Sequence, residues 1–475
     1  MLFTSVMDAQ QSRRSVLKTT GLAATVGLAG MAGCSSLGGG TGGGNAAQQI
    51  NFENLGNREA SENVELEFWI SIGAEDLVQG IVDRFNEQSD SITVSVSNQG
   101  NYNEVWNQTQ QAQTAGSPPG IVHLNAVSTL PAWAEDVVIP AEDLIGPEID
   151  RSNFVSAVSN YYVIDDTLLG LPFGVSTVAC SYNRSAFEQA GLASHPDDVE
   201  LTTFDDWQTA ADAVMAETEM SSGVTWPQIG WFYETFFATQ GQNVVNNENG
   251  RASPATASYF DSDAARRMYE WNSSMYESNR YQLSADWSEA RQAFLSGQVA
   301  VQMDSSAALA ALSGGAREAG FEHGVGTVPS ATTDGREGPI IGGGALFVPT
   351  GIDGAKLKAA AELMLWLSQP EQQAEWHMST GYYPLSREAI TIAEEQGFYE
   401  ESPQFRRAFE QFASRPETPA TAGAFTYDHG EVRTEIVNGL DRLYGGNSVE
   451  DVVSSTKSNV DDVLARASDA DPRSE

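Results

Sequence analysis

The chain has 475 residues and a formal net charge of −39, with 64 acidic residues against 25 lysines and arginines. Such a charge excludes nucleic acid as a partner, because a phosphate backbone would be repelled. Lysine occurs only at Lys18, Lys356, Lys358 and Lys457. Dispersed acidity with arginine preferred over lysine is typical of proteins that stay hydrated in concentrated salt, so we expect a halophilic source.

Residues 1–33 have the pattern of an export signal. Arg13 and Arg14 precede an apolar stretch, Gly21 to Gly33, as in twin-arginine signals. Its 13 residues are fewer than the ~20 that a helix needs to cross a bilayer. The stretch ends in Met31-Ala32-Gly33-Cys34, which resembles a lipobox and makes Cys34 the expected lipid anchor. An ordinary cleaved signal with an unrelated cysteine is the alternative.

Residues 34–63 are rich in Gly, Ser, Asn and Gln, a composition that predicts a flexible tether. The 442 residues after the signal exceed what one hydrophobic core usually supports, so we expect two lobes. Cys180 is the one cysteine besides Cys34, which leaves no internal disulfide to expect after cleavage of the signal.

Strands and amphipathic helices alternate along the body, which predicts an α/β fold. Thr203 is the expected N-cap of a helix, and Asp206 completes a near capping box. Two of the predicted helices have a clear apolar face. Leu77, Ile81, Val82 and Phe85 form that of the helix 75–88, and Ala210, Ala213 and Val214 form that of the helix that Thr203 caps. The predicted strands are 64–72, 92–96, 175–182 and 340–348, the last two as crossings between lobes, and the predicted helices are 75–88, 262–277 and 355–367.

Catalytic motifs are missing from the sequence. No Gly-x-Ser-x-Gly elbow, His-Glu-x-x-His motif or phosphate-binding loop of the Gly-x-x-x-x-Gly-Lys type occurs. The five histidines are isolated from one another, so each is expected to be a packed or surface residue rather than a metal ligand. We therefore expect no catalytic residue, no metal and no cofactor.

Several segments resemble the extracytoplasmic glycerol-3-phosphate-binding proteins of ABC importers and the wider solute-binding family 1. The segments are Phe68-Trp69-Ile70-Ser71, Gly100-Asn101-Tyr102-Asn103, Leu171-Pro172-Phe173, Tyr182-Asn183, 294–300, 340–346, 374–377, 380–385 and 395–400. The resemblance covers nearly all of residues 64–460. It implies a periplasmic-binding-protein-like type II fold, in which two α/β lobes are joined by a hinge and the ligand lies in the cleft between them.

The resemblance also implies the lobe boundaries. Lobe 1 is expected to comprise residues 64–178 and 345–382, and lobe 2 residues 179–344 and 383–465. Residues 466–475 are expected to form a disordered acidic tail. The implied partners are a small-molecule ligand, the membrane permease subunits and their ATPase. A lipid-anchored monomer on the outer face of the cytoplasmic membrane is expected.

Carried over residue by residue, the resemblance implies a set of ligand contacts. They are Tyr102, Ser176, Trp231, Ser305, Ser306, the amides of Gly343 and Gly344, and Tyr382. Each also has a packing explanation, because a rim aromatic, a strand hydroxyl or a tight glycine crossing needs no ligand.

Two positions depart from the family pattern. Ala126 falls where the family carries a carboxylate that holds glycerol hydroxyls, and Phe425 falls where it carries an arginine that faces the phosphate. Arg415 or Arg433 could supply that cation instead. The leading hypothesis is a receptor for glycerol 3-phosphate or a related glycerophosphodiester. A receptor for a neutral sugar, oligosaccharide or polyol, an exported hydrolase and a purely structural surface lipoprotein are the alternatives.

Overall fold

The computed structural model describes residues 63–71, 73–195, 199, 201–352, 354–468 and 470–474. The predicted signal, Cys34 and almost all of the tether lie outside the described residues. In the described part of the chain, no helix combines the length and the apolar character that a bilayer span needs.

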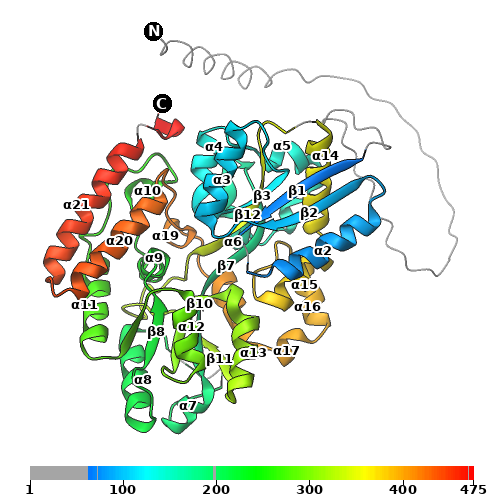
Figure 1. Cartoon of the computed structure of the whole chain (residues 1–475). Coiled ribbons are helices and arrows are strands. Elements are labelled where there is room, and N and C mark those ends of the chain that lie inside the picture. The colour runs from blue at the N-terminus through cyan, green and yellow to red at the C-terminus, as the bar shows by residue number, and fades with distance from the viewer. Residues whose placement is uncertain are drawn as a thin grey trace, which may run out of the picture. The chain divides into compact units, whose positions relative to one another are not determined.

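The helices and strands form two groups in Figure 1, and one continuous run of hydrogen-bonded strands passes through both groups. Its order is β2-β1-β3-β12-β7-β10-β8-β9, with β4 beside β12 and β11 beside β7. β1 is parallel to β2 and β3, β8 is parallel to β9 and β10, and β12 and β7 are antiparallel to their neighbours. The strands are β1 (Val64–Ile70), β2 (Ile92–Asn98), β3 (Ile121–Asn125), β4 (Val138–Ile139), β7 (Leu171–Asn183), β8 (Val224–Pro227), β9 (Tyr281–Ser284), β10 (Val301–Ser305), β11 (His323–Gly326) and β12 (Ile341–Pro349), and a separate pair joins β5 (Val163–Ile164) to β6 (Thr167–Leu168).

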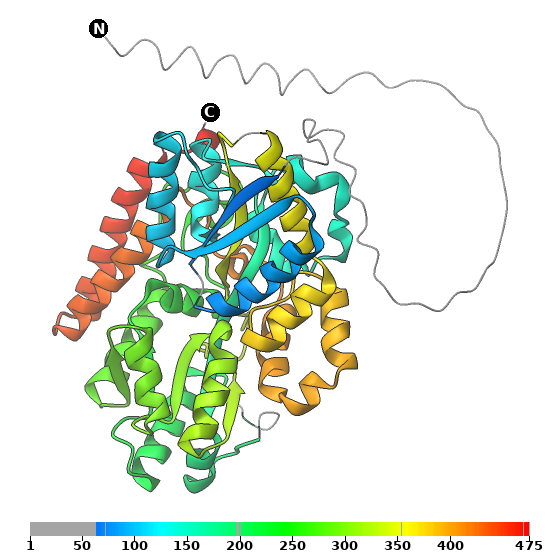
Figure 2. The same ribbon diagram turned by 45° about the vertical axis from the view of Figure 1, so that its right-hand side comes forward.

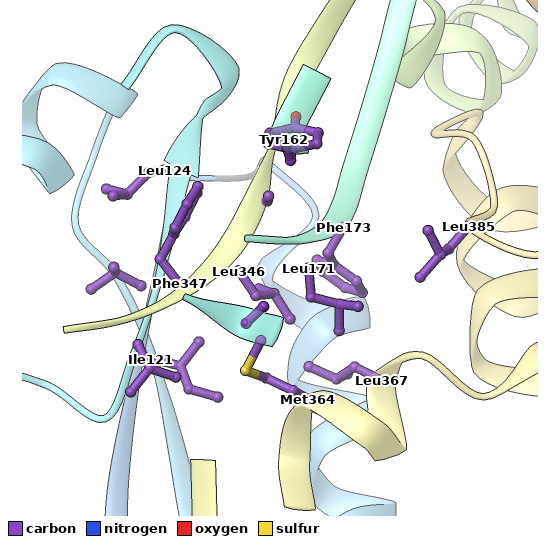
Figure 3. Packing of buried hydrophobic residues seen from close by; sticks show 14 of the residues in the cluster. Ile121, Leu124, Tyr162, Leu171, Phe173, Leu346, Phe347, Met364, Leu367 and Leu385 are labelled. Carbon is purple, nitrogen blue, oxygen red and sulfur yellow. The ribbon is translucent and has the colours of Figure 1, made fainter. Parts of the chain in front are cut away.

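The first lobe is built on β1, β2, β3 and the adjoining parts of β7 and β12. Figure 3 shows its core, where Phe347 and Leu346 of β12 pack among Leu124, Leu171 and Met364. The strands alternate buried and exposed residues only in β1 and β2, because β3 and β7 are covered on both faces. Its helices are α2 (Glu75–Gln88), α3 (Tyr102–Thr114), α4 (Thr129–Ala134), α5 (Ala141–Ile145), α6 (Ser156–Ser159), α14 (Gly354–Leu367) and α15 (Pro370–Thr380).

The second lobe has a separate core, rich in stacked aromatic rings. The rings of Phe204 and Trp271 stack with centroids 4.3 Å apart, and Trp226 lies 5.7 Å from Trp271. The predicted capping box is confirmed, because the Asp206 amide donates to Thr203 Oγ1 and the Thr203 amide donates to the Asp206 carboxylate. The helices here are α7 (Arg184–Gln189), α8 (Phe204–Glu217), α9 (Gly230–Thr239), α11 (Asp263–Glu277), α12 (Trp287–Leu295), α13 (Leu309–Ala319), α20 (His429–Tyr444) and α21 (Val449–Ser468).

Three segments pass from one core to the other. In β7, Leu171, Phe173 and Val175 belong to the first core, whereas Val178, Cys180 and Tyr182 belong to the second. Likewise Ile341 packs in the first core and Ile340 in the second, and Phe425 packs in the first and Ala424 in the second. Figure 2 shows the two groups of elements that these segments connect. The cavity described below lies where they cross.

The remaining helices follow β12 and α15 along the chain. Tyr399, Phe405 and Ala408 of these helices form a smaller apolar cluster with Ala179 of β7 and Val325 of β11. A left-handed turn, α10 (Asn246–Gly250), contacts the third crossing, because the Phe425 amide donates a hydrogen bond to the Asn249 carbonyl oxygen. The helices are α16 (Arg387–Glu395), α17 (Phe398–Glu401), α18 (Pro403–Ala413) and α19 (Pro419–Ala422).

The C-terminal segment differs from the disordered tail expected for residues 466–475. α21 continues to Ser468, and Asp471 is only 3% exposed. The Arg473 guanidinium pairs with the Asp471 carboxylate and also donates to the Gly250 carbonyl, 2.7 Å away. An acidic composition predicts disorder only where the carboxylates have no cation to pair with, and here Arg473 supplies a cation for Asp471.

Candidate functional site

A cavity of about 580 Å³ lies between the two cores. This volume is within the ~300–1,000 Å³ typical of small-molecule sites. Residues from both lobes and all three crossings contribute to its wall. They are Ser71, Gly73, Asn101, Tyr102, Asn103, Asn125, Ala126, Val127, Tyr161, Ser176, Ile229, Trp231, Trp287, Arg291, Ser305, Ala307, Ile340, Ile341, Gly342, Gly343, Tyr382, Gly423, Gly430 and Arg433.

Six of the eight residues predicted as ligand contacts line this cavity, namely Tyr102, Ser176, Trp231, Ser305, Gly343 and Tyr382. Ser306 lies outside the wall, because its hydroxyl is buried and accepts the Thr177 amide. Gly344 also lies outside it, where an added Cβ would be 2.2 Å from the Leu124 carbonyl oxygen. Both positions therefore have the packing role that was the alternative to ligand contact. Ligand binding by the six wall residues stays a prediction.

Tyr102 and Tyr382 form an aromatic wall supported from behind. Tyr102 follows the N-cap Asn101 as the first residue of α3, and its ring lies 5.4 Å from that of His123. Tyr382 stacks on Trp376 with centroids 5.2 Å apart. The Tyr102 hydroxyl is buried near Ser71 and Tyr382, yet it makes no hydrogen bond of good geometry with the described residues.

Two histidines hold these tyrosines in place. His377 Nδ1 donates to the Tyr382 carbonyl oxygen, 2.7 Å away, and its Nε2 accepts from the Tyr399 hydroxyl at 2.9 Å. His123 Nε2 donates to the Phe173 carbonyl oxygen at 2.8 Å. Burial lowers the pKa of each of these imidazoles to about 4, so both are neutral at pH 7.

Trp231 lies on the opposite side, at the start of α9. Its Nε1 donates to the Ile341 carbonyl oxygen at 2.9 Å, which fixes the indole across the β12 crossing. An added Cβ at Gly342 would lie 2.4 Å from this ring, so glycine is required for the close approach. The neighbouring Trp287 adds a second indole to the wall, with its centroid 6.4 Å from that of Trp231.

Arg291 carries a positive charge to the cavity and is fixed by a buried carboxylate. Its Nε and Nη2 donate to the two Asp304 oxygens at 2.7 and 3.0 Å. Asp304 is fully buried in β10 and also accepts from Gln302 and from the Ser305 amide. Burial raises the pKa of Asp304, while Arg291 acts in the opposite direction. The remaining nitrogen, Nη1, has no hydrogen bond with the described residues.

Arg433 brings a second positive charge from α20. Its Nε lies 2.9 Å and its Nη2 2.8 Å from the Glu234 carboxylate in α9. Glu234 also accepts from His429 Nε2 and from the Ala424 amide. Burial alone would raise the pKa of Glu234, but the Arg433 charge and His429 bring it below its ordinary value. Glu234 is therefore ionised at neutral pH and orients Arg433.

The two departures from the family pattern have different outcomes. Ala126 lines the cavity, so no carboxylate stands at that point of the wall. Phe425 does not line it, because its ring packs against Tyr161 with centroids 5.5 Å apart. Of the two alternative arginines, Arg433 lines the cavity and Arg415 lines a neighbouring one.

Sequence reasoning missed Trp287 and Arg291, and it left Arg433 as one of two alternatives. Trp287 and Arg291 are four residues apart on α12, which follows the carboxyl end of β9. Their position just after a strand could have predicted them as ligand contacts, because ligands in open α/β sheets bind beyond the carboxyl ends of strands. In contrast, the pairing of Arg433 with Glu234 joins residues far apart in the sequence, and no local pattern announces it.

Among the described residues, no group of three His, Cys, Asp or Glu side chains is placed to hold a metal ion. Two α/β cores, three crossings between them and a cavity with aromatic, hydroxyl, amide and guanidinium groups on its wall define a two-lobed ligand-binding protein.

Comparisons with known proteins agree with this class. Residues 80–406 match the family model of the bacterial extracellular solute-binding proteins. The chain is 30% identical over 400 residues to the sn-glycerol-3-phosphate-binding periplasmic protein UgpB of Pectobacterium atrosepticum, covering 82% of this chain and 88% of that protein. The corresponding Escherichia coli protein is 29% identical over 405 residues, covering 82% and 90%. The chain belongs to the extracellular solute-binding protein family.

Solved structures confirm the expected type II fold with two α/β lobes. UgpB of Mycobacterium tuberculosis, in complex with glycerophosphocholine, superposes with a TM-score of 0.73 at 18% identity, covering 85% of this chain and 99% of that one. The sugar-binding protein MalE of Xanthomonas citri superposes with a TM-score of 0.68 at 19% identity, covering 85% and 98%.

Proposed function

We propose that this protein captures glycerol 3-phosphate or a glycerophosphodiester outside the cell and delivers it to the permease subunits and ATPase of an ABC importer. The observation that carries the proposal is the pair of guanidinium groups, Arg291 and Arg433, on the cavity wall. Each is held by a buried carboxylate along its Nε edge and leaves Nη1 available. Guanidinium groups held in this way suit the planar, multidentate recognition of phosphate.

Helix N-termini add to the preference for an anion. Tyr102, Trp231, Trp287 and Gly430 lie in the first turns of α3, α9, α12 and α20, and all of them line the cavity. The positive ends of these helices favour a negatively charged group. Ser176 and Tyr102 line the same wall, and their hydroxyl groups support the binding of glycerol hydroxyl groups there.

The size of the cavity favours the larger members of this ligand class. A volume of about 580 Å³ is more than one three-carbon phosphate fills, whereas a glycerophosphodiester adds a head group that can pack against Trp231 and Trp287. The names of the relatives, which are glycerol-3-phosphate-binding proteins, support the phosphate part of the proposal.

A neutral sugar, oligosaccharide or polyol is the second candidate. Arg291 and Arg433 are already neutralised by Asp304 and Glu234, so the wall carries little net charge. Indole and phenol rings also pack well on the C–H faces of sugars. Ala126, where the family has a carboxylate, changes the hydroxyl-binding part of the wall in a way that either ligand class can accommodate.

Isothermal titration calorimetry in high salt separates these candidates. We expect binding of glycerol 3-phosphate and of glycerophosphodiesters, and at least a ten-fold loss for the double variant Glu234→Gln/Arg433→Gln, because a charge-assisted hydrogen bond contributes about 1.5–3 kcal/mol. The double variant removes both charges and leaves no buried ion unpaired. Binding of a neutral sugar with no response to any phosphate ester would overturn the first-choice ligand.

We also propose that the protein is exported by the twin-arginine route and held on the outer face of the cytoplasmic membrane by acylated Cys34, as a monomer from a halophilic source. The sequence of residues 12–34 supports the export and the anchor. Cys34→Ser is expected to release the protein from the membrane fraction into the medium, and Arg13→Lys/Arg14→Lys to retain it inside the cell. A membrane-bound Cys34→Ser protein would contradict the anchor.

No catalytic role is proposed. Recovery of the bound ligand after prolonged incubation tests this directly, because a binding protein returns glycerophosphodiesters unchanged and a hydrolase does not. A chromogenic ester and glycoside assay extends the same test to other substrates.

A further inference from the structure

A second, smaller cavity of about 280 Å³ lies beside the first. Tyr161 and Ile341 line both cavities and separate them. Arg251 and Arg415 lie on the wall of the smaller one. We propose that Arg251 and Arg415 together bind a small inorganic anion, a halide or phosphate, at a site distinct from that of the transported ligand.

Arg251 is a guanidinium without a carboxylate. Its Nη2 donates to the Ala422 and Gly423 carbonyl oxygens at 2.8 and 3.2 Å, and its Cζ lies 5.0 Å from the centre of the Tyr161 ring. Its Nε is buried and has no partner among the described residues. No carboxylate of the described chain lies within ion-pair distance of it. One edge of this cation is therefore desolvated and unsatisfied.

Arg415 has the same arrangement. Its Nη1 donates to the Phe412 carbonyl oxygen at 2.6 Å, and its Cζ lies 3.8 Å above the Phe412 ring. Its Nε is also buried and has no partner within the part of the chain that the structure describes. Burial lowers the pKa of Arg415 to about 10, which leaves it charged at neutral pH.

Three other arginines near the cavities do have a carboxylate as countercharge. Arg291, Arg433 and Arg473 are each paired with a well-buried carboxylate. A desolvated guanidinium without such a partner is unfavourable. The one carboxylate on the wall of the smaller cavity, Glu417, acts on the Arg415 charge, but it is exposed and accepts hydrogen bonds from Ser156 and Asn160. A bound anion would supply the buried countercharge that both arginines lack.

The position of the site connects it to the arrangement of the lobes. Arg251 follows the left-handed turn α10, and its guanidinium lies over the rings of Tyr161 and Phe425, which both belong to the first core. Arg415 lies between α18 and α19, and its neighbour Phe412 packs in the first core. An anion shared by the two guanidiniums would therefore link α10 to the segment between α18 and α19, next to the third crossing.

Crystals grown in sodium bromide test the site directly. We expect an anomalous bromide peak within hydrogen-bond distance of both guanidiniums, and no such peak in the Arg251→Gln/Arg415→Gln variant. A wild-type cavity without bromide would overturn the proposal. Because the double variant removes two packed side chains, Arg415→Lys serves as a second variant that keeps the charge and is expected to retain a weaker peak.

Chloride titrations followed by the chlorine NMR line width give the affinity in solution. We expect the Arg251→Gln/Arg415→Gln variant to bind chloride at least about ten-fold more weakly than the wild type. Arg387→Gln is the control and is expected to keep the wild-type affinity, because the Arg387 guanidinium is exposed, although it also donates to a carbonyl oxygen, that of Ser152. Equal chloride affinity in all three proteins would overturn the proposal, and so would displacement of the chloride by glycerol 3-phosphate. Inorganic phosphate, followed by phosphorus NMR, is expected to compete with chloride in the wild type.

Discussion

The Arg433 guanidinium and the Glu234 carboxylate meet through one oxygen, with Nε and Nη2 lying 2.9 and 2.8 Å from Glu234 Oε2. The carboxylate is almost fully buried, and the guanidinium reaches the cavity wall. Removing one partner of a buried pair leaves the other uncompensated, which costs far more than the pair contributes as a whole.

Glu234→Gln is therefore expected to lower the free energy of unfolding by about 3 kcal/mol. Urea denaturation at a fixed high salt concentration measures the change. Glu431→Gln is the matched control, since Glu431 pairs with Arg466 at the surface and its loss is expected to change the free energy by less than about 1 kcal/mol. Equal effects of the two substitutions would show that Glu234 is not the buried anchor of Arg433.

Tyr102→Phe tests the unpaired hydroxyl on the cavity wall. Because that hydroxyl makes no hydrogen bond with the described residues, its removal is expected to leave the melting temperature unchanged or slightly raised. Ligand affinity, measured by calorimetry, is expected to fall about ten-fold if the hydroxyl binds the ligand. Tyr259→Phe, at an exposed tyrosine, serves as the control. Unchanged affinity would remove Tyr102 from the ligand contacts.

Stability is expected to fall between pH 6.5 and pH 4. Burial lowers the pKa of His123, His323 and His377 to about 4, whereas an unfolded histidine titrates near 6.5. The unfolded chain binds more protons over this range, so their contribution is complete above pH 6.5 and is lost as the pH falls to 4. Each pKa unit corresponds to about 1.4 kcal/mol per histidine.

Chemical denaturation at several pH values measures this slope. His377→Gln is expected to flatten it and, because His377 holds the Tyr382 carbonyl, to weaken ligand binding as well. A His377→Gln protein with the full slope would contradict the assignment.

Gly343→Ala is expected to destabilise the protein by roughly 2 kcal/mol or more. Its φ is +78°, and an added Cβ would lie 1.9 Å from the Gly174 carbonyl oxygen at the irregularity between β12 and β7. Gly314→Ala is the control, because this glycine lies in α13 with open space around it, and alanine there is expected to add about 0.5–1 kcal/mol. Thermal unfolding of the two variants measures both changes.

Local patterns in the sequence predicted much of the fold. The bounds of α2 and the cap of α8 are confirmed. Periodicity placed Leu77 and Ala213 on the inner faces of α2 and α8, where both are only partly buried. Val78 and Ala211 are fully buried instead, because the neighbouring elements decide which side of a helix faces inward.

Six wall residues were predicted from the family resemblance, and of these Tyr102 begins a helix and Ser305 ends a strand. Ser176 and Gly343 lie inside strands, where no local signal marks them. The support of Arg433 by Glu234 and of Tyr382 by His377 depends on how distant segments pack, which no spacing encodes. The same limit applies to the C-terminal segment, where the composition gives no sign of the contact between Arg473 and Gly250.

The strand β7 contributes one half of its length to each core, and every one of its 13 residues is buried. Neither lobe can therefore be excised as an autonomous fragment, because either cut would expose half of an apolar strand. Damage to one lobe should spread to the other through this shared strand, and calorimetry should record a single cooperative melting transition rather than two.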